Sequence, residues 1–178
     1  MGILCPYFFA MRNKNVKYIT TAALIAAMYV ALTYLQNFLL PGSASWAIQF
    51  RVSEALCVLA FYTPAAIPGL TIGCLLFNIS FAGALPLDFA VGSLATLLAT
   101  GGMWLTRKMT VGKLPVLGLL FPSFANGLLV GWELSVYIGG AFWLNAVQVA
   151  IGEAAVLLIL GTALYYALRP YKTRLFER

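Results

Sequence analysis

The chain has 178 residues, of which 62% are hydrophobic and only 9% are charged, and its net charge is +6. Soluble domains carry roughly 25% charged residues, and a soluble domain of this size cannot hide so much apolar surface from water. The composition therefore predicts an all-α integral membrane protein. Six spanning helices of roughly 20 residues would use most of the chain, which leaves no room for a soluble catalytic or nucleotide-binding domain.

Histidine is absent, and the three cysteines, Cys5, Cys57 and Cys74, form no CxxC pair. Metal binding and His-dependent catalysis are therefore not expected. Cys57 and Cys74 lie in apolar runs, where packed thiols are the expected role. No glycine-rich phosphate loop is present, so energy from ATP would have to come from a partner chain.

Six apolar segments, taken in chain order, predict a bundle of six transmembrane helices between an N-terminal segment (1–17) and a basic tail (169–178). They cover residues 18–40, 48–62, 64–81, 86–106, 114–132 and 140–168. Segment 48–62 would rise only about 22 Å as an α-helix, short of the roughly 30 Å hydrocarbon core. A tilted helix and a re-entrant loop both remain open there, as do Met1 and Met11 as the natural start.

The basic residues indicate topology and not nucleic-acid binding, because they lie between the apolar blocks. Ten of the eleven lie within residues 12–17, 107–113 and 169–178, and Arg51 is the exception. With six spans, all ten fall on one side of the membrane, which the positive-inside rule makes cytoplasmic. We therefore expect a multi-pass protein of a bacterial cytoplasmic membrane with both termini in the cytoplasm.

Ionisable groups inside membrane segments are costly and mark functional or paired positions. Here they are Arg51, Glu54, Asp88, Glu133 and Glu153. Arg51 and Glu54 are spaced i, i+3, so they either form a structural ion pair or contact a ligand. Asp88 begins the fourth segment and follows Asn78 at the end of the third. Asp88 either favours a helix N-terminus or belongs to a binding site.

Two further groups of residues suit a flat, nitrogen-rich ligand. Trp132 can stack on such a ligand and Glu133 can accept two parallel N–H bonds, unless both are ordinary interfacial residues. In the last segment Asn145 and Gln148 share a polar face, which either reads a heterocycle or joins neighbouring helices. Glu153 lies deeper and is protonated, paired or part of the site.

The first segment carries alanines at four-residue spacing, which makes a flat face for close helix approach. They are Ala22, Ala23, Ala26, Ala27 and Ala31. The face packs either inside this chain or against another subunit.

Four stretches in order resemble the QueT family of queuosine-precursor transporters. They are residues 48–56 (IQFRVSEAL), 64–78 (PAAIPGLTIGCLLFN), 92–100 (GSLATLLAT) and 145–153 (NAVQVAIGE). The resemblance covers roughly residues 15–168. It implies a six-helix substrate-binding subunit, or S component, of an energy-coupling factor (ECF) transporter.

Such a subunit would bind a 7-deazaguanine, such as 7-aminomethyl-7-deazaguanine, from outside. It would then dock through its alanine face on a transmembrane coupling subunit (T component) that two cytoplasmic ATPases drive, with no cofactor of its own. The resemblance places the pocket near the outer face, where Trp46, Trp132, Glu133, Asn145 and Gln148 fall. An S component for another vitamin-like cargo and a stand-alone facilitator are the alternatives. An intramembrane enzyme could use its carboxylates as acid and base, but no histidine, metal cluster or nucleophile elbow supports it.

Overall fold

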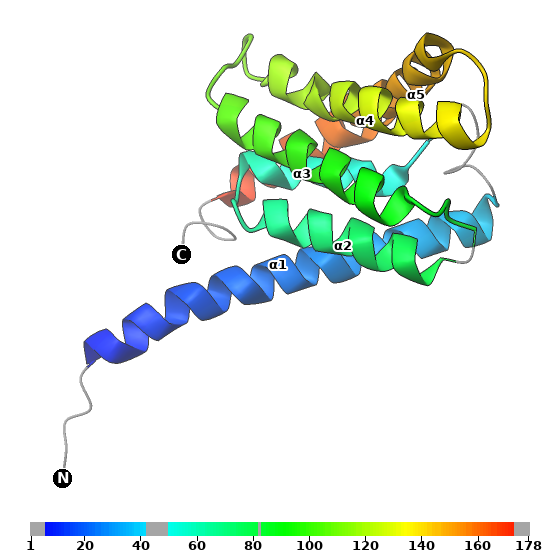
Figure 1. The fold of residues 1–178 in the computed structure, drawn as a ribbon. Helices are drawn as coiled ribbons and strands as arrows, with labels where there is room; N and C mark the ends of the chain where they lie inside the picture. The colour runs from blue at the N-terminus through cyan, green and yellow to red at the C-terminus, as the bar shows by residue number, and fades with distance from the viewer. Residues whose placement is uncertain (1–5, 42–49, 82, 173–178) are drawn as a thin grey trace.

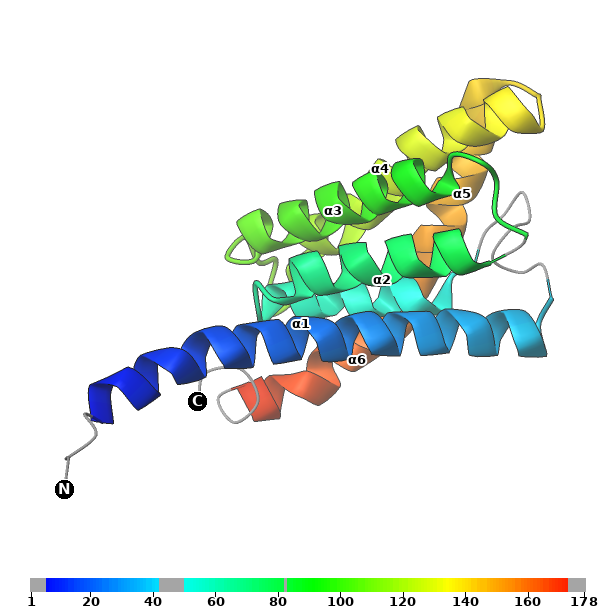
Figure 2. The ribbon, with the colours of Figure 1, turned by 60° about the horizontal axis from the view of Figure 1, so that its bottom comes forward.

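The computed structural model describes residues 6–41, 50–81 and 83–172, and within these ranges the regular structure is helical apart from one isolated bridge between Val111 and Leu114. The α-helices follow one another with two short 3-10 helices (η1 and η3) and one π-helical turn (η2). In order they are α1 (Pro6–Leu39), η1 (Val52–Phe61), α2 (Ala66–Ser80), α3 (Asp88–Thr106), α4 (Val116–Tyr137), α5 (Phe142–Val156), η2 (Leu157–Gly161), α6 (Thr162–Leu168) and η3 (Arg169–Tyr171). Consecutive α-helices from α1 to α5 pack side by side, and α5, η2 and α6 form one continuous helical rod (Figures 1 and 2).

Helices α1 and α2 run parallel and approach each other closely. A Cβ atom added at Gly69 would lie 2.7 Å from the backbone oxygen of Ala22, and one at Gly73 would lie 3.0 Å from that of Ala26. Residues later in α2 thus contact residues later in α1, so the two helices run in the same direction. Because the two helices point the same way, the chain between them must return along the bundle, and it does so through η1 (Figure 1).

Segment η1 lies at the centre of the bundle, where it contacts α1, α2, α3, α4, α5, η2 and α6. Every residue from Ser53 to Phe61 is buried. At about 2.0 Å per residue, a ten-residue 3-10 helix rises only about 20 Å, which is too short to cross a bilayer alone. The expectation of a full α-helix over residues 48–62 is therefore wrong for the described part of that segment, which is a buried interior helix of tighter geometry.

Four helical stretches are long and apolar enough to cross a membrane. They are Lys14–Leu39, Asp88–Thr106, Val116–Tyr137 and Phe142–Tyr171. Helix α2, with 15 residues, is shorter than a typical span. The chain is thus a helical membrane protein, and the count of six spans stays a prediction.

Two helices extend beyond their expected ends. Helix α1 begins at Pro6 instead of residue 18, and its 34 residues rise about 51 Å, so its first turns project past the rest of the bundle (Figure 2). Helix α4 continues to Tyr137, five residues past the expected end at Trp132. This extension changes the environment of Glu133 from a helix end to a helix interior.

Proline positions agree with the helix boundaries. Pro68 lies in the first turn of α2, where backbone N–H groups have no intrahelical acceptor, so its missing donor costs nothing. Pro115 immediately precedes α4, and Pro122 is accommodated inside it. Cys57 and Cys74 are buried free thiols, in agreement with their expected packing role.

The close approach of α1 and α2 makes a stability prediction. Gly73→Val should lower the free energy of unfolding by about 1–3 kcal/mol, because its side chain would overlap the backbone of Ala26 and the Cβ atom of Tyr29. Gly101→Ala is the matched control, since nothing lies within 4 Å of a Cβ atom there. Thermal unfolding in detergent measures both variants, and equal melting temperatures would contradict the close packing.

Candidate functional site

Glu54 is fixed at the centre of the bundle by two hydrogen-bond donors. It is completely buried, and its two carboxylate oxygens accept bonds from the Tyr29 hydroxyl at 2.7 Å and from the Cys57 thiol at 3.1 Å. Tyr29 comes from α1, so this bond ties the long first helix to η1. Arg51, only 8% exposed, interacts electrostatically with Glu54, as expected from their spacing.

Asp88 and Asn78 organise the connection between α2 and α3. The Asn78 amide donates to the backbone oxygen of Asp88 at 2.8 Å, and Asp88 Oδ2 accepts the backbone N–H of Leu85 at 2.7 Å. Asp88 thus holds the loop that precedes α3. The Asp88 carboxylate also lies close enough to Arg51 and Glu133 to interact with both.

Glu133 is completely buried on α4, and its oxygens meet no donor group of a described residue other than the neighbouring carboxyl of Asp88. The alternative that it is a solvated interfacial residue is therefore wrong. Its electrostatic neighbours are Asp88 and Arg51. A buried carboxylate without donors is costly unless a group from outside the chain completes it.

Glu153 of α5 belongs to the same polar interior. It is 1% exposed and interacts electrostatically with Glu54 and Arg51, while its Oε2 atom has no described partner. Four of the five acidic residues in the chain thus gather around one arginine. We call Arg51, Glu54, Asp88, Glu133 and Glu153 the acidic cluster. Its excess of acceptor oxygens favours a ligand that is rich in N–H donors or carries a positive charge.

The remaining candidates lie at the edge of this cluster or outside it. The Asn145 amide donates to the Gly139 carbonyl at 3.0 Å and to the Ser135 hydroxyl at 3.1 Å, so it closes the turn between α4 and α5. Gln148 is half-buried, and Trp132 is 48% exposed beside its buried neighbour Glu133. Trp46 lies outside the described residues.

Sequence reasoning missed two polar residues of the interior. Tyr29, which is 1% exposed, donates to Glu54, and Asn126, which is 3% exposed, has an amide nitrogen without a described partner. Asn126 precedes Glu133 by seven residues, so the two share one face of α4. The seven-residue spacing can be read from the sequence. It indicates that Asn126 is buried only when Glu133 is known to point into the bundle.

No group of three or more Cys, Asp or Glu side chains in the described ranges is arranged to hold a metal ion. Arg51 lies among the carboxylates of the acidic cluster and interacts electrostatically with Glu54, Asp88, Glu133 and Glu153.

The alanines of α1 divide between two environments. Ala22 and Ala26 are buried against α2, so for these two the alternative of packing inside the chain is correct. Ala23, Ala27 and Ala31 are exposed. Together with Pro68 and Ile72 of α2, they line a shallow apolar groove of about 790 Å³ on the outside of the bundle.

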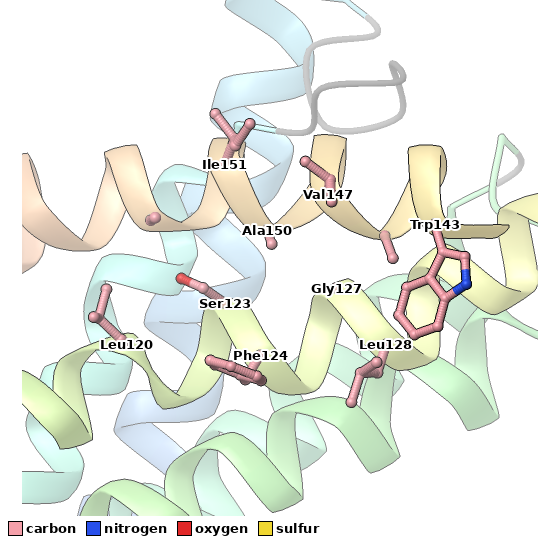
Figure 3. Close-up of a pocket in the computed structure, with 11 residues that line it drawn as sticks. Leu120, Ser123, Phe124, Gly127, Leu128, Trp143, Val147, Ala150 and Ile151 are labelled. Carbon is pink, nitrogen blue, oxygen red and sulfur yellow. The ribbon is translucent and has the colours of Figure 1, made fainter. Parts of the chain in front are cut away.

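A second groove, of about 340 Å³, lies between α4 and α5 (Figure 3). Its walls are almost entirely apolar, with Phe124 and Leu128 on one side and Val147 and Ile151 on the other. The indole of Trp143 lies at one end of this groove. The groove lacks the charged groups of the acidic cluster and so is not the candidate ligand site.

Comparisons with known proteins agree with the resemblance. The family model described as "QueT transporter" matches residues 19–170. The curated protein "Queuosine precursor transporter QueT" of Lactococcus lactis subsp. cremoris (strain MG1363) is 39% identical over 88 residues, which cover 49% of this chain and 50% of that protein. The match thus spans about half the length of this relative, and no solved structure matches the chain. Because the family model covers most of the sequence, the chain belongs to the QueT transporter family and is a transporter protein, not an enzyme.

Proposed function

We propose that this chain is the substrate-binding S component of an ECF-type importer that takes up a queuosine precursor. The ligand would be a 7-deazaguanine such as 7-aminomethyl-7-deazaguanine, captured from outside the cell. The observation that carries the proposal is the acidic cluster, with its excess of buried carboxylates. A guanine-like ring supplies several N–H donors and the aminomethyl group supplies a cation, which together complement these oxygens.

Arg51 has a distinct role in this proposal. Without it, four carboxylates would repel one another in a medium of low dielectric constant. Its guanidinium interacts with both Glu54 and Asp88, so it lowers the repulsion without removing the net acceptor character of the site. The Glu133 oxygens, whose one polar neighbour within hydrogen-bond reach among the described residues is the Asp88 carboxyl, are then available to the ligand.

The six-pass topology is part of the same proposal. Because α1 and α2 are parallel and η1 returns between them, the segments alternate in direction along the chain. The first turn of α1 and η3 consequently lie at the same end of the bundle (Figures 1 and 2). The positive-inside rule makes that end cytoplasmic.

Docking on the coupling subunit would use the exposed alanines Ala23, Ala27 and Ala31 on α1. These small side chains let a partner helix approach closely, and the groove that they line is almost entirely apolar. The partner would be the T component, which two cytoplasmic ATPases drive. The chain itself would need no cofactor.

Glu133→Gln should weaken ligand binding by about 30-fold or more, because a buried charged partner of the ligand is worth roughly 2–5 kcal/mol. Titration calorimetry of the purified chain with 7-aminomethyl-7-deazaguanine, without ATP, measures this. Ser135→Ala on the same helix is the control. An unchanged dissociation constant for Glu133→Gln would remove Glu133 from the site, and no binding by the folded wild-type chain would favour another cargo.

Ala23→Leu combined with Ala27→Leu should abolish uptake in cells while the purified variant binds its ligand with near wild-type affinity. Larger side chains prevent close helix approach, whereas the acidic cluster lies on the other side of α1. Leu94→Phe with Leu97→Phe, at exposed positions of α3, is the matched control. Uptake at the full rate would show that this face does not dock a partner, and a stand-alone facilitator would then be favoured.

Single cysteines should locate the two ends of the bundle. In a variant that lacks Cys5, a cysteine at Ala141 should react with a membrane-impermeant maleimide in intact cells. A cysteine at Lys108 should react only after permeabilisation. Both positions are exposed in the structure. Labelling of both from the same side would contradict the six-pass topology.

A further inference from the structure

The amide of Asn126 is a buried donor inside the bundle with no acceptor. Asn126 is 3% exposed, and its Nδ2 atom makes no hydrogen bond to any described residue. It shares one face of α4 with Leu119, seven residues before it, and with Glu133, seven residues after it. Both of these residues are completely buried, so this face points into the bundle.

Glu153 provides an unpartnered acceptor at a similar depth. Gly127 of α4 lies against Ala150 of α5, since an added Cβ atom would meet the Ala150 Cβ atom at 3.0 Å. Farther along the same antiparallel pair, Ser123 and Ala154 line one groove (Figure 3). Asn126 is adjacent in sequence to Gly127, and Glu153 is adjacent to Ala154. Asn126 and Glu153 therefore lie within about one helical turn of each other along the bundle.

An unpaired buried donor and an unpaired buried acceptor each cost roughly 1–3 kcal/mol or more. The two together complement a group that offers one acceptor and one donor side by side. A cyclic amide edge, in which a ring carbonyl adjoins a ring N–H, is such a group. Each oxygen of Glu54 already accepts one hydrogen bond, from Tyr29 or Cys57, whereas Glu153 Oε2 accepts none from a described residue, so Glu153 is the better acceptor for this edge.

We propose that Asn126 and Glu153 form a recognition pair for the cyclic amide edge of the ligand. The Asn126 amide donates to the ring carbonyl oxygen, and Glu153 Oε2 accepts the adjacent ring N–H. This inference rests on the proposed function and deepens it, since 7-deazaguanines carry this edge. Asn126 is then the residue that distinguishes a 6-oxo ring from a 6-amino ring.

The recognition pair also orients the ligand in the bundle. Glu133 lies two turns from Asn126 on the same face of α4, about 10 Å along the helix axis. With the amide edge at Asn126 and Glu153, the substituted five-membered ring and its aminomethyl cation point toward Glu133 and Asp88. The two ends of the ligand thus meet different carboxylates.

The test compares two neutral ligands that differ along the edge read by the recognition pair. They are 7-deazaguanine, which presents a 6-oxo group and an N1–H, and 2,6-diamino-7-deazapurine, which presents a 6-amino group and an N1 atom without hydrogen. Calorimetry is carried out on the full chain as wild type, Asn126→Ala, Asn126→Asp and Glu153→Gln. Phe124→Leu is the control, because Phe124 is an exposed residue of the same helix.

Asn126→Ala should weaken binding of 7-deazaguanine by about 10-fold or more and leave binding of the diamino ligand nearly unchanged. Asn126→Asp exchanges a donor for an acceptor at the 6-position and should reduce the preference for 7-deazaguanine, while Glu153 still favours its N1–H. Glu153→Gln, which keeps the side-chain shape, should weaken 7-deazaguanine binding and keep the fold. Phe124→Leu should match the wild type for both ligands.

Two outcomes would overturn the recognition pair. If Asn126→Asp and Glu153→Gln keep wild-type affinity and preference, the pair does not contact the ligand, while the proposed function stands. If the folded wild-type chain binds no deazaguanine, the proposed function fails and the recognition pair fails with it. Melting curves of each variant separate a loss of binding from a loss of fold, and Glu153→Gln keeps the test decisive if Asn126→Ala does not fold.

Discussion

A charged segment buried at the centre of a membrane bundle is the constraint on which the rest of this structure depends. Arg51 and Glu54 stand at the start of η1, which the other helices surround. Neither charge can be left without partners in so apolar a setting. Tyr29 from α1, Asp88 from α3 and Glu153 from α5 each approach this point, so the helices converge where the charges are.

Much of the fold could be predicted from the sequence, because breakers and apolar runs mark most helices. Segment η1 was the exception, since a short run that is apolar on all sides has no periodicity to separate a 3-10 helix from an α-helix. The site was predicted in part. Glu54 and Glu153 stood out as charges in apolar runs, but the burial of Glu133 depends on where α4 ends. The burial of Asn126 can be predicted only when it is known which face of α4 points into the bundle.

The separation of polar and apolar features over the molecule follows from the same packing. Carboxylates gather inside, while both grooves on the outside are apolar. Glycines at 69 and 73 let α2 lie close against α1, which directs Ala22 and Ala26 inward and leaves their neighbours Ala23 and Ala27 outside. Neighbouring alanines of α1 therefore lie on different surfaces, one packed against α2 and one exposed on the outside of the bundle. Their spacing in the sequence cannot distinguish the two.

The bond from Tyr29 to Glu54 has a mechanical consequence. Tyr29 and Ala27 are two residues apart on one helix, so a rigid displacement of the outer surface of α1 moves the Tyr29 hydroxyl by a similar amount. A hydrogen bond of 2.7 Å is largely lost once its atoms separate by about another ångström. Displacement of α1 relative to η1 would thus break a bond that holds the Glu54 carboxylate, so the position of the first helix and the stability of that buried charge are coupled.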